Sequence, residues 1–258
     1  MAANAAIPVP ERHSDWDLEL ILGRPVLGRR LNIAVIGAHP DDPETGCGGT
    51  IAKLSRDGHR VTVVYLTRGE AGVRDADHST TARIRTLEAL SAAEILGANA
   101  VFANQIDGRT SATAEDSARF TDLLRSLRPD IAYTHWPHDT HPDHRTTAEL
   151  TRLAWETLGR EFTLVYYEVM TGVQTHDFQP NLYVDVSMSE DEKRAAIYAH
   201  VCQRPDRFYP YHVNMERQRG SEAGLARAEA FTVVRHTPAT VIPFPSAEGH
   251  IRKYATRG

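Results

Sequence analysis

Short apolar runs rich in β-branched residues alternate along the chain with longer segments of helical periodicity. Five runs are predicted to be buried strands: residues 31–37, 60–67, 99–103, 130–134 and 163–169. The segments between them are predicted to be helices over residues 46–57, 79–96, 113–127 and 144–158. Regular alternation of strand and helix implies right-handed crossovers. The chain is therefore predicted to form an α/β domain with a mostly parallel sheet and helices on both faces.

The pattern loosens after residue 170, which predicts a smaller C-terminal elaboration. Its parts, in order, are the stretch "LYVDVS", a helix over about 189–202, the irregular segment "QRPDRFYPYHVN", a helix to about residue 230 and the stretch "FTVVR". We predict an N-terminal arm over residues 1–30, a single domain over 31–236 and a C-terminal tail over 237–258. The arm and the tail are candidates for a contact in a homo-oligomer.

The bulk properties exclude several classes of partner. The length of 258 residues suits one α/β domain, and a formal net charge of −5 with interspersed signs leaves no basic face for nucleic acid or anionic lipid. Cys47 and Cys202 lie far apart in sequence, so we expect no disulfide framework. Because neither a signal peptide nor an apolar segment of membrane-spanning length is evident, the protein is predicted to be cytoplasmic.

Three loops that follow predicted strands carry reactive side chains: "AHPDD", "LTRGEAGVRDADH" and "THWPHDTHPDHR". The first and third loops each contain His-Pro-Asp, at residues 39–41 and 141–143. In an open parallel sheet, ligands bind outside the carboxyl ends of the strands. We therefore expect the two His-Pro-Asp motifs to converge on one point.

Histidine and aspartate side chains from two loops can supply the three protein ligands of a catalytic zinc site. The adjacent pair Asp41 and Asp42 suggests a division of labour, with one carboxylate on the metal and the other acting as a general base on water. A histidine nearby could stabilise an oxyanion. This combination predicts a hydrolase of an unactivated carbonyl compound.

The stretches "GAHPDDPETGCGGTIAKL" and "HPDH" resemble the two signature motifs of the LmbE-like, or PIG-L-type, zinc-dependent N-deacetylases. The resemblance extends to "VTVVYLTRGEAG", "RIRTLEALSAAEILGA", "IDG" and "RGSEAGLARAEAF", and it covers roughly residues 31–232. It implies a Rossmann-like fold. It also implies removal of an acetyl group from an N-acetylglucosaminyl compound or a related amino sugar.

The resemblance implies a role for each residue of the two motifs. The zinc ligands are His39, Asp42 and His144. Asp41 is the general base, and His141 stabilises the tetrahedral oxyanion or protonates the amine. Asp143 is expected to orient His141. The same ligand types could hold iron, cobalt or manganese in place of Zn²⁺.

Three further residues are predicted to contact the substrate. In weaker matches to the family, Arg85 and Asp107 approach sugar hydroxyls. Arg68 in "RGEAG" has two interpretations of equal weight, a substrate contact and an ordinary solvated turn.

Other residues in these loops also have structural interpretations. Asp41 could cap the following helix, because aspartate is a favoured capping residue. His135 and His138 are interpreted as polar loop residues or substrate contacts rather than a second metal site, and Cys47 as a small buried helix residue. The segment "QRPDRFYPYH" could line the pocket mouth or a subunit contact, and a structural role is preferred.

Three alternative functions remain to be weighed. The first is a family amidase that acts on a thiol conjugate or another acylated amine. The second is a catalytically inactive sugar-binding relative, which the intact set of key residues disfavours. A nucleotide binder is rejected, because Gly-x-Gly-x-x-Gly is absent from the first loop and a carboxylate pair there would repel a pyrophosphate.

Overall fold

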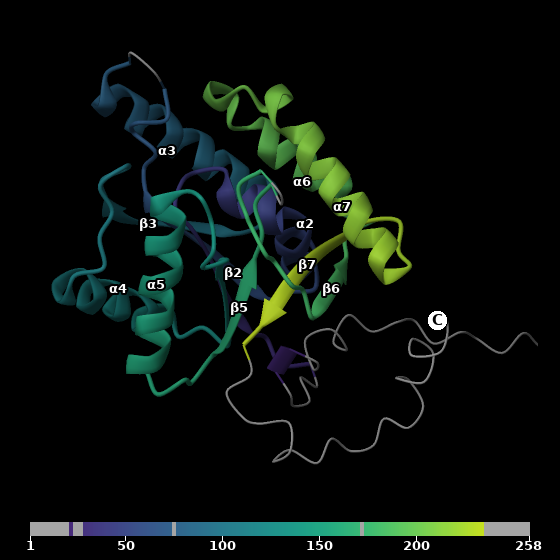
Figure 1. Ribbon diagram of the computed structural model, residues 1–258, viewed down its shortest axis with the longest axis horizontal. Helices are drawn as coiled ribbons and strands as arrows, with labels where there is room; N and C mark the ends of the chain where they lie inside the picture. The colour runs from purple at the N-terminus through teal and green to yellow at the C-terminus, as the bar shows by residue number, and fades with distance from the viewer. Residues whose placement is uncertain (1–20, 23–27, 74–75, 171–172, 235–258) are drawn as a thin grey trace, which may run out of the picture.

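A seven-stranded sheet forms the centre of the protein, as the computed structural model shows for residues 21–22, 28–73, 76–170 and 173–234 (Figure 1). Its strands are β1 (Asn32–Gly37), β2 (Arg60–Thr67), β3 (Asn99–Gln105), β4 (Ile131–His135), β5 (Thr163–Tyr167), β6 (Leu182–Asp185) and β7 (Ala228–Val233). The strand order is β3-β2-β1-β4-β5-β7-β6. The first five strands in this order pair in parallel, whereas β7 pairs antiparallel with both β5 and β6. The predicted mostly parallel sheet is confirmed.

Helices cover both faces of the sheet, also as predicted (Figure 1). They are α2 (Asp42–Arg56), α3 (His78–Ile95), α4 (Ala114–Leu127), α5 (Pro142–Thr157), α6 (Glu190–Tyr198) and α7 (Tyr209–Ala223), with the 3₁₀ turns η1 (Val201–Gln203) and η2 (Pro205–Arg207). One core cluster joins the sheet to α2, α3 and α6, and a second joins it to α4 and α5.

Strand β1 shows how the sequence builds these two cores. Its side chains alternate between the faces, as the pleat of a strand requires. Ile33 and Val35 lie in the first cluster, while Ala34 and Ile36 lie in the second. Because both faces are buried, the strand is apolar from Ile33 to Ile36.

The order of the strands determines where a ligand can bind. Strand β1 lies between β2 and β4, so the chain proceeds outward from β1 in one direction through β2 and β3 and in the other through β4 and β5. Such a reversal opens a crevice at the carboxyl ends of the two central strands. The loops after β1 and β4, which carry the two His-Pro-Asp motifs, border this crevice.

The C-terminal elaboration differs from its prediction in detail. Helix α7 begins at Tyr209, inside the segment predicted to be irregular, and ends at Ala223 rather than near residue 230. Gly224, with a φ of 72°, ends the helix in the left-handed conformation. Most of the predicted arm (1–30) and all of the predicted tail (237–258) lie outside the described residues. Among the residues the structure describes, no helix has the length and apolar character needed to cross a membrane.

Candidate metal centre

The turn between β1 and α2 holds the first His-Pro-Asp motif in a strained conformation. A Cβ atom on Gly37 would lie 2.6 Å from Cδ of Pro43, so only glycine fits there. Asp41 has φ 119° and ψ −27°, a region that side-chain-bearing residues rarely occupy. It occupies the N-cap position of α2, yet its side chain makes no capping hydrogen bond. The capping interpretation of Asp41 is therefore wrong, and its carboxylate lines a pocket instead.

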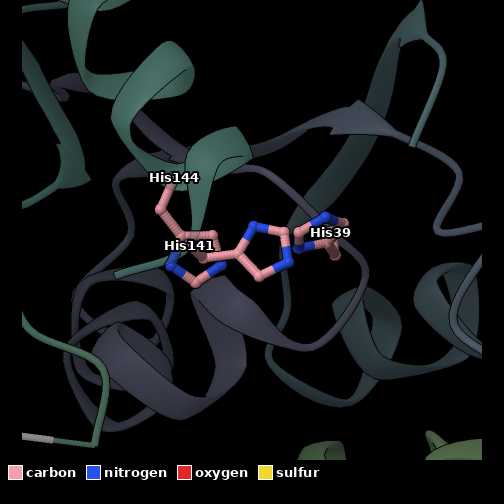
Figure 2. A group of neighbouring side chains, drawn as sticks. All are labelled: His39, His141 and His144. Atoms are coloured by element: carbon pink, nitrogen blue, oxygen red, sulfur yellow. The ribbon is translucent and has the colours of Figure 1, made fainter. Parts of the chain in front are cut away.

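This pocket has a volume of about 440 Å³, within the usual range for small-molecule sites. Seven of the predicted site residues line it: His39, Asp41, Asp42, Arg85, Asp107, His141 and His144. The two His-Pro-Asp motifs thus converge, as expected. Figure 2 shows the imidazoles of His39, His141 and His144 grouped together, and their ligand atoms lie within 4.8 Å of one another.

The predicted metal ligands lie at suitable separations. Oδ2 of Asp42 is 3.2 Å from Nδ1 of His39, and Oδ1 of Asp42 is 3.3 Å from Nε2 of His144. Ligand atoms on a tetrahedral zinc are roughly 3.3 Å apart, given bonds of about 2.0–2.1 Å. All three side chains are buried. The donor set therefore fits a divalent transition metal.

The electrostatics of the cluster also favour a cation. Burial acts to lower the pKa of His39, but the carboxylates of Asp107, Asp143 and Asp42 raise it well above its ordinary value. Burial likewise opposes protonation of His144, whose pKa the surrounding carboxylates nevertheless raise to about 9. The cluster thus attracts positive charge, which a metal ion could supply in place of protons.

Asp139, which was not predicted from the sequence, contacts the nitrogen of His144 that faces away from Asp42. Its Oδ2 is 3.1 Å from Nδ1 of His144, and its Oδ1 accepts a hydrogen bond from the backbone N–H of His141 at 2.8 Å. A carboxylate on the outer nitrogen of a metal-binding histidine fixes the tautomer and the ring orientation. Asp139 lies in the same loop as "HPDH", and this rule could have identified it.

His135 is not the loop residue that was predicted. It is the last residue of β4 and is completely buried, with its ring stacked on His144 at 3.8 Å. Its Nε2 accepts a hydrogen bond from the backbone N–H of Ala38 at 3.0 Å. Although this nitrogen also lies 3.3 Å from Oδ2 of Asp42, its lone pair is already engaged, which argues against a ligand role. Burial lowers the pKa of His135 to about 4, so the ring is neutral at physiological pH. It packs against His144 beneath the site.

Asp143 supports a different histidine from the one predicted. Its Oδ2 lies 3.2 Å from Nε2 of His39, and the carboxylate also accepts hydrogen bonds from the backbone N–H of Gly108 and the hydroxyl of Thr110. Only the backbone N–H of Asp143 touches His141, donating to its Nδ1 at 3.2 Å. This bond assigns the proton of a neutral His141 to Nε2, so the ring can donate a hydrogen bond from that atom.

The predicted substrate residues have distinct environments. Asp107 lines the pocket, with Oδ1 3.1 Å from Nε2 of His39. Arg85 also lines it, but it is buried, donates to the carbonyl oxygens of Pro40 and Gly69, and lies 3.3 Å from Oδ2 of Asp41. Its hydrogen-bonding capacity is therefore directed largely to the protein, and the structure argues for a positioning role.

Arg68 lies outside the pocket. It donates to the side chains of Asn104 and Thr86, and its guanidinium lies 4.6 Å from the centre of the Phe102 ring. These contacts argue against the substrate contact that was predicted for Arg68.

His138 is exposed beside Trp136, and neither residue lines the pocket.

Asp41 has the electrostatic character of a base. Burial raises the pKa of its carboxyl group to about 6, against the opposing effect of Arg85. A general base is most effective when its pKa lies near the working pH.

Cys47 is a completely buried member of the apolar core, as predicted.

The far wall of the pocket comes from the C-terminal elaboration. Gln203, Phe208 and His212 line it, and all three lie in or beside the segment "QRPDRFYPYH". The structural role preferred for this segment is therefore wrong in part. No sequence signal separates its pocket-facing residues from their neighbours.

Comparison with known proteins places this site in a family. The sequence model of the PIG-L family, described as GlcNAc-PI de-N-acetylase, matches residues 34–155. A diacetylchitobiose deacetylase from Thermococcus kodakarensis is 29% identical over 232 residues, covering 82% of this chain and 86% of that protein. A 4-oxalmesaconate hydratase from Pseudomonas putida is 27% identical over 207 residues, covering 73% and 80%.

A solved structure extends the match to the fold. The N,N'-diacetylchitobiose deacetylase from Pyrococcus horikoshii superposes with a TM-score of 0.70 at 25% identity, covering 91% of this chain and 99% of that one. The sequence motifs, the open α/β fold and the relatives named deacetylases agree with one another. The chain belongs to the PIG-L family of GlcNAc-PI de-N-acetylases.

Proposed function

We propose that the protein is a metal-dependent N-deacetylase that removes the acetyl group from an N-acetylglucosaminyl compound or a related amino sugar. One observation carries this proposal above the others. The carboxylate of Asp41 is held off its helix cap in a pocket that it shares with His39, Asp42 and His144. A base beside a metal-ligand set is the arrangement that amide hydrolysis needs.

His39, Asp42 and His144 would hold the metal, with Asp139 supporting His144 and Asp143 supporting His39. When bound, zinc or another divalent cation supplies a Lewis acid that polarises a carbonyl and lowers the pKa of water. Arg85 holds the loop that carries Asp41 through the carbonyl oxygen of Pro40. These contacts fix the base relative to the ligands before the substrate arrives.

In the first step, Asp41 takes a proton from the water that attacks the acetamido carbonyl carbon. A neutral His141 donates a hydrogen bond from Nε2 to the carbonyl oxygen as negative charge develops there. Burial and the neighbouring histidines His39 and His144 lower the pKa of His141, which favours this neutral form. The C–N bond then breaks as the nitrogen receives the proton that Asp41 took from the water, so that acetate and a free amine leave and Asp41 is again a carboxylate.

The hydratase relative raises a second possible chemistry, which the charge of the pocket disfavours. A carboxylate-rich substrate, of the kind that the hydratase's name implies, needs cationic partners. Even with a divalent metal ion bound, the pocket is lined by three carboxylates, those of Asp41, Asp42 and Asp107. Among the described lining residues Arg85 is the only arginine or lysine, and it is engaged by Asp41 and two carbonyl oxygens. A neutral amide substrate fits this charge distribution better.

The test is acetate release from a panel of N-acetylglucosaminyl compounds by metal-loaded protein. Asp41→Asn and a chelated sample are the inactive arms, and Asp122→Asn, an exposed carboxylate on α4, is the matched control. Release that requires both the metal and Asp41 would support the proposal. If only an acylated thiol conjugate or another acylated amine is hydrolysed, the reaction stands as metal-dependent amide hydrolysis and the substrate is not an amino sugar. Failure of the protein to bind a metal ion would contradict the proposed metal-dependent hydrolysis.

A further inference from the structure

The order of the strands divides the lining of the catalytic pocket into two sides. Strands β2 and β3 lie on one side of β1, and β5 lies on the far side of β4. Asp107 follows β3 and lines the pocket on one side of the proposed metal ligands, whereas Val169 and Met170 follow β5 and line it on the other. Phe208 and His212 lie at the start of α7, which packs against β7 and β6 beyond β5, so they belong to the second side.

The two sides differ in polarity. On the β3 side, Asp107 presents a carboxylate to the pocket. On the β5 side, the side chains of Val169, Met170 and Phe208 present hydrocarbon, thioether and aromatic surface. The proposed reaction assigns no role to these three residues.

The polar residues on the β5 side carry no formal charge. Gln174 directs its amide toward His144, with Nε2 3.3 Å from Nδ1 of the ring. Burial and the nearby ammonium group of Lys193 lower the pKa of His212 to about 3, so its imidazole is neutral. Among the described lining residues, the β5 side is therefore the uncharged and mostly apolar side of the pocket.

Burial separates a floor from a rim on the β5 side. Val169 is 4% exposed and His212 is 1% exposed, whereas Met170 and Phe208 are half-buried. The rings of His212 and Phe208 meet edge to face, with their centroids 6.0 Å apart. Val169 and His212 therefore close this side of the pocket at depth, and Met170 and Phe208 lie nearer its opening.

An N-acylated amino sugar also has two dissimilar ends. Its amide carbonyl carbon bears an apolar acyl chain in one direction and, through nitrogen, a ring with hydroxyl groups in the other. Hydroxyl groups need hydrogen-bond partners, and the carboxylate of Asp107 can accept from them. An acyl chain gains most from burial against apolar side chains. With the carbonyl group beside the metal ligands, the sugar thus matches the β3 side and the acyl chain matches the β5 side.

We propose that Val169, Met170, Phe208 and His212 form the acyl pocket of the protein, and that the floor made by Val169 and His212 limits the acyl chain to the length of an acetyl group. This inference rests on the proposed deacetylase function and deepens it, because it assigns one part of the substrate to named side chains. A longer chain on the same sugar meets the floor and is hydrolysed less efficiently.

The test compares kcat/KM for amine release from N-acetyl-, N-propionyl- and N-butyrylglucosamine by the metal-loaded protein. For the wild type, kcat/KM should fall as the chain lengthens. His212→Ala should raise the butyryl-to-acetyl ratio of kcat/KM about tenfold, the factor that burial of two methylene groups contributes. His212→Phe restores the bulk of the ring and should keep the wild-type ratio. If His212 acted through a hydrogen bond instead, His212→Phe would behave like His212→Ala, and the steric floor would be overturned.

Two further variants complete the comparison. Val169→Ala shortens the other side chain of the floor and should shift the ratio in the same direction, so it carries the test if His212→Ala does not fold. His138→Ala removes an exposed histidine outside the pocket and should leave the ratio unchanged.

Binding of acetate and butyrate to the metal-loaded protein, measured by calorimetry, separates failure of the acyl pocket from failure of the proposed function. These carboxylates carry the acyl chain without any sugar. The wild type should favour acetate, and His212→Ala should shift the ratio of dissociation constants toward butyrate. If the sugars are hydrolysed but neither ratio changes in His212→Ala or Val169→Ala, the acyl pocket is overturned and the deacetylase function stands.

If no N-acylglucosamine is hydrolysed, the proposed function fails for this substrate class. A shift toward butyrate in the binding ratio of His212→Ala would then still support an acyl pocket on the β5 side. An unchanged binding ratio would overturn both proposals.

Discussion

Asp139 and Asp42 face opposite nitrogen atoms of a single imidazole ring, that of His144. Oδ2 of Asp139 lies 3.1 Å from Nδ1, and Oδ1 of Asp42 lies 3.3 Å from Nε2. The first contact directs the proton of a neutral ring to Nδ1 and leaves the lone pair of Nε2 directed at the proposed metal position. Orientation of the proposed ligand His144 therefore depends on a residue outside the His-Pro-Asp motif.

Asp139→Asn should weaken metal binding about 10- to 100-fold, because the amide supports the histidine less well than a carboxylate does. The measurement is the metal dissociation constant from competition with a chromophoric chelator. Asp122→Asn serves as the control for loss of one carboxylate. An unchanged dissociation constant would show that Asp139 only holds the loop.

Asp41→Asn should keep the metal and lose turnover by about 10²- to 10⁴-fold, the usual contribution of a general base. His144→Ala should instead lose metal affinity. Metal content by elemental analysis, measured beside acetate release, separates the two effects. Equal loss of metal from both variants would contradict the assignment of Asp41 as the base and His144 as a metal ligand.

The pH dependence of kcat/KM should carry the signature of Asp41. Burial raises its pKa to about 6, and the carboxyl group acts as a base only when deprotonated, so the rate should fall as the pH falls through that value. A bound cation nearby favours the carboxylate, so the acid limb should lie at or below about pH 6. The residual activity of Asp41→Asn should lack this limb. A limb that persists unchanged in the variant would assign it to another group.

Lys193 should be essential to the stability of the domain. Its ammonium group is buried between Glu216, at 2.8 Å, and Glu229, at 2.6 Å. Lys193→Met should lower the free energy of unfolding by about 3–5 kcal/mol, because buried carboxylates lose their partner. Urea denaturation measures the change, with Arg125→Met on the surface of α4 as control. Adding Glu229→Gln to Lys193→Met should recover part of the loss.

The fold was largely predictable because the central parallel strands, such as β1 and β2, are buried over most of their length and are therefore mostly apolar. Helix α7 begins inside the segment that was predicted to be irregular, and Pro210 lies in its first turn. Proline lacks a backbone N–H, but the first turn of a helix does not need that donor, and Pro210 lies there. The short antiparallel strands β6 and β7 depend on the sheet edge that they join, which local sequence does not encode.

The site was predictable where adjacent residues set the geometry and not where distant segments meet. Convergence of His39, Asp42 and His144 follows from the order of the strands. The partner of Asp143 does not, because the orientation of its carboxylate depends on Gly108 and Thr110 from another loop. Similarly, the sequence alone could not indicate that Arg85 reaches back to Pro40 across 45 residues.

The backbone conformation of Asp41 is expected to lower the stability of the fold at a position that the proposed reaction needs. A φ of 119° is a conformation that glycine adopts freely and aspartate adopts at a cost of about 1–3 kcal/mol. Asp41→Gly should therefore raise the melting temperature of the protein while it abolishes deacetylation. If Asp41 is the base of the proposed reaction, its carboxylate is retained at this position at the expense of stability.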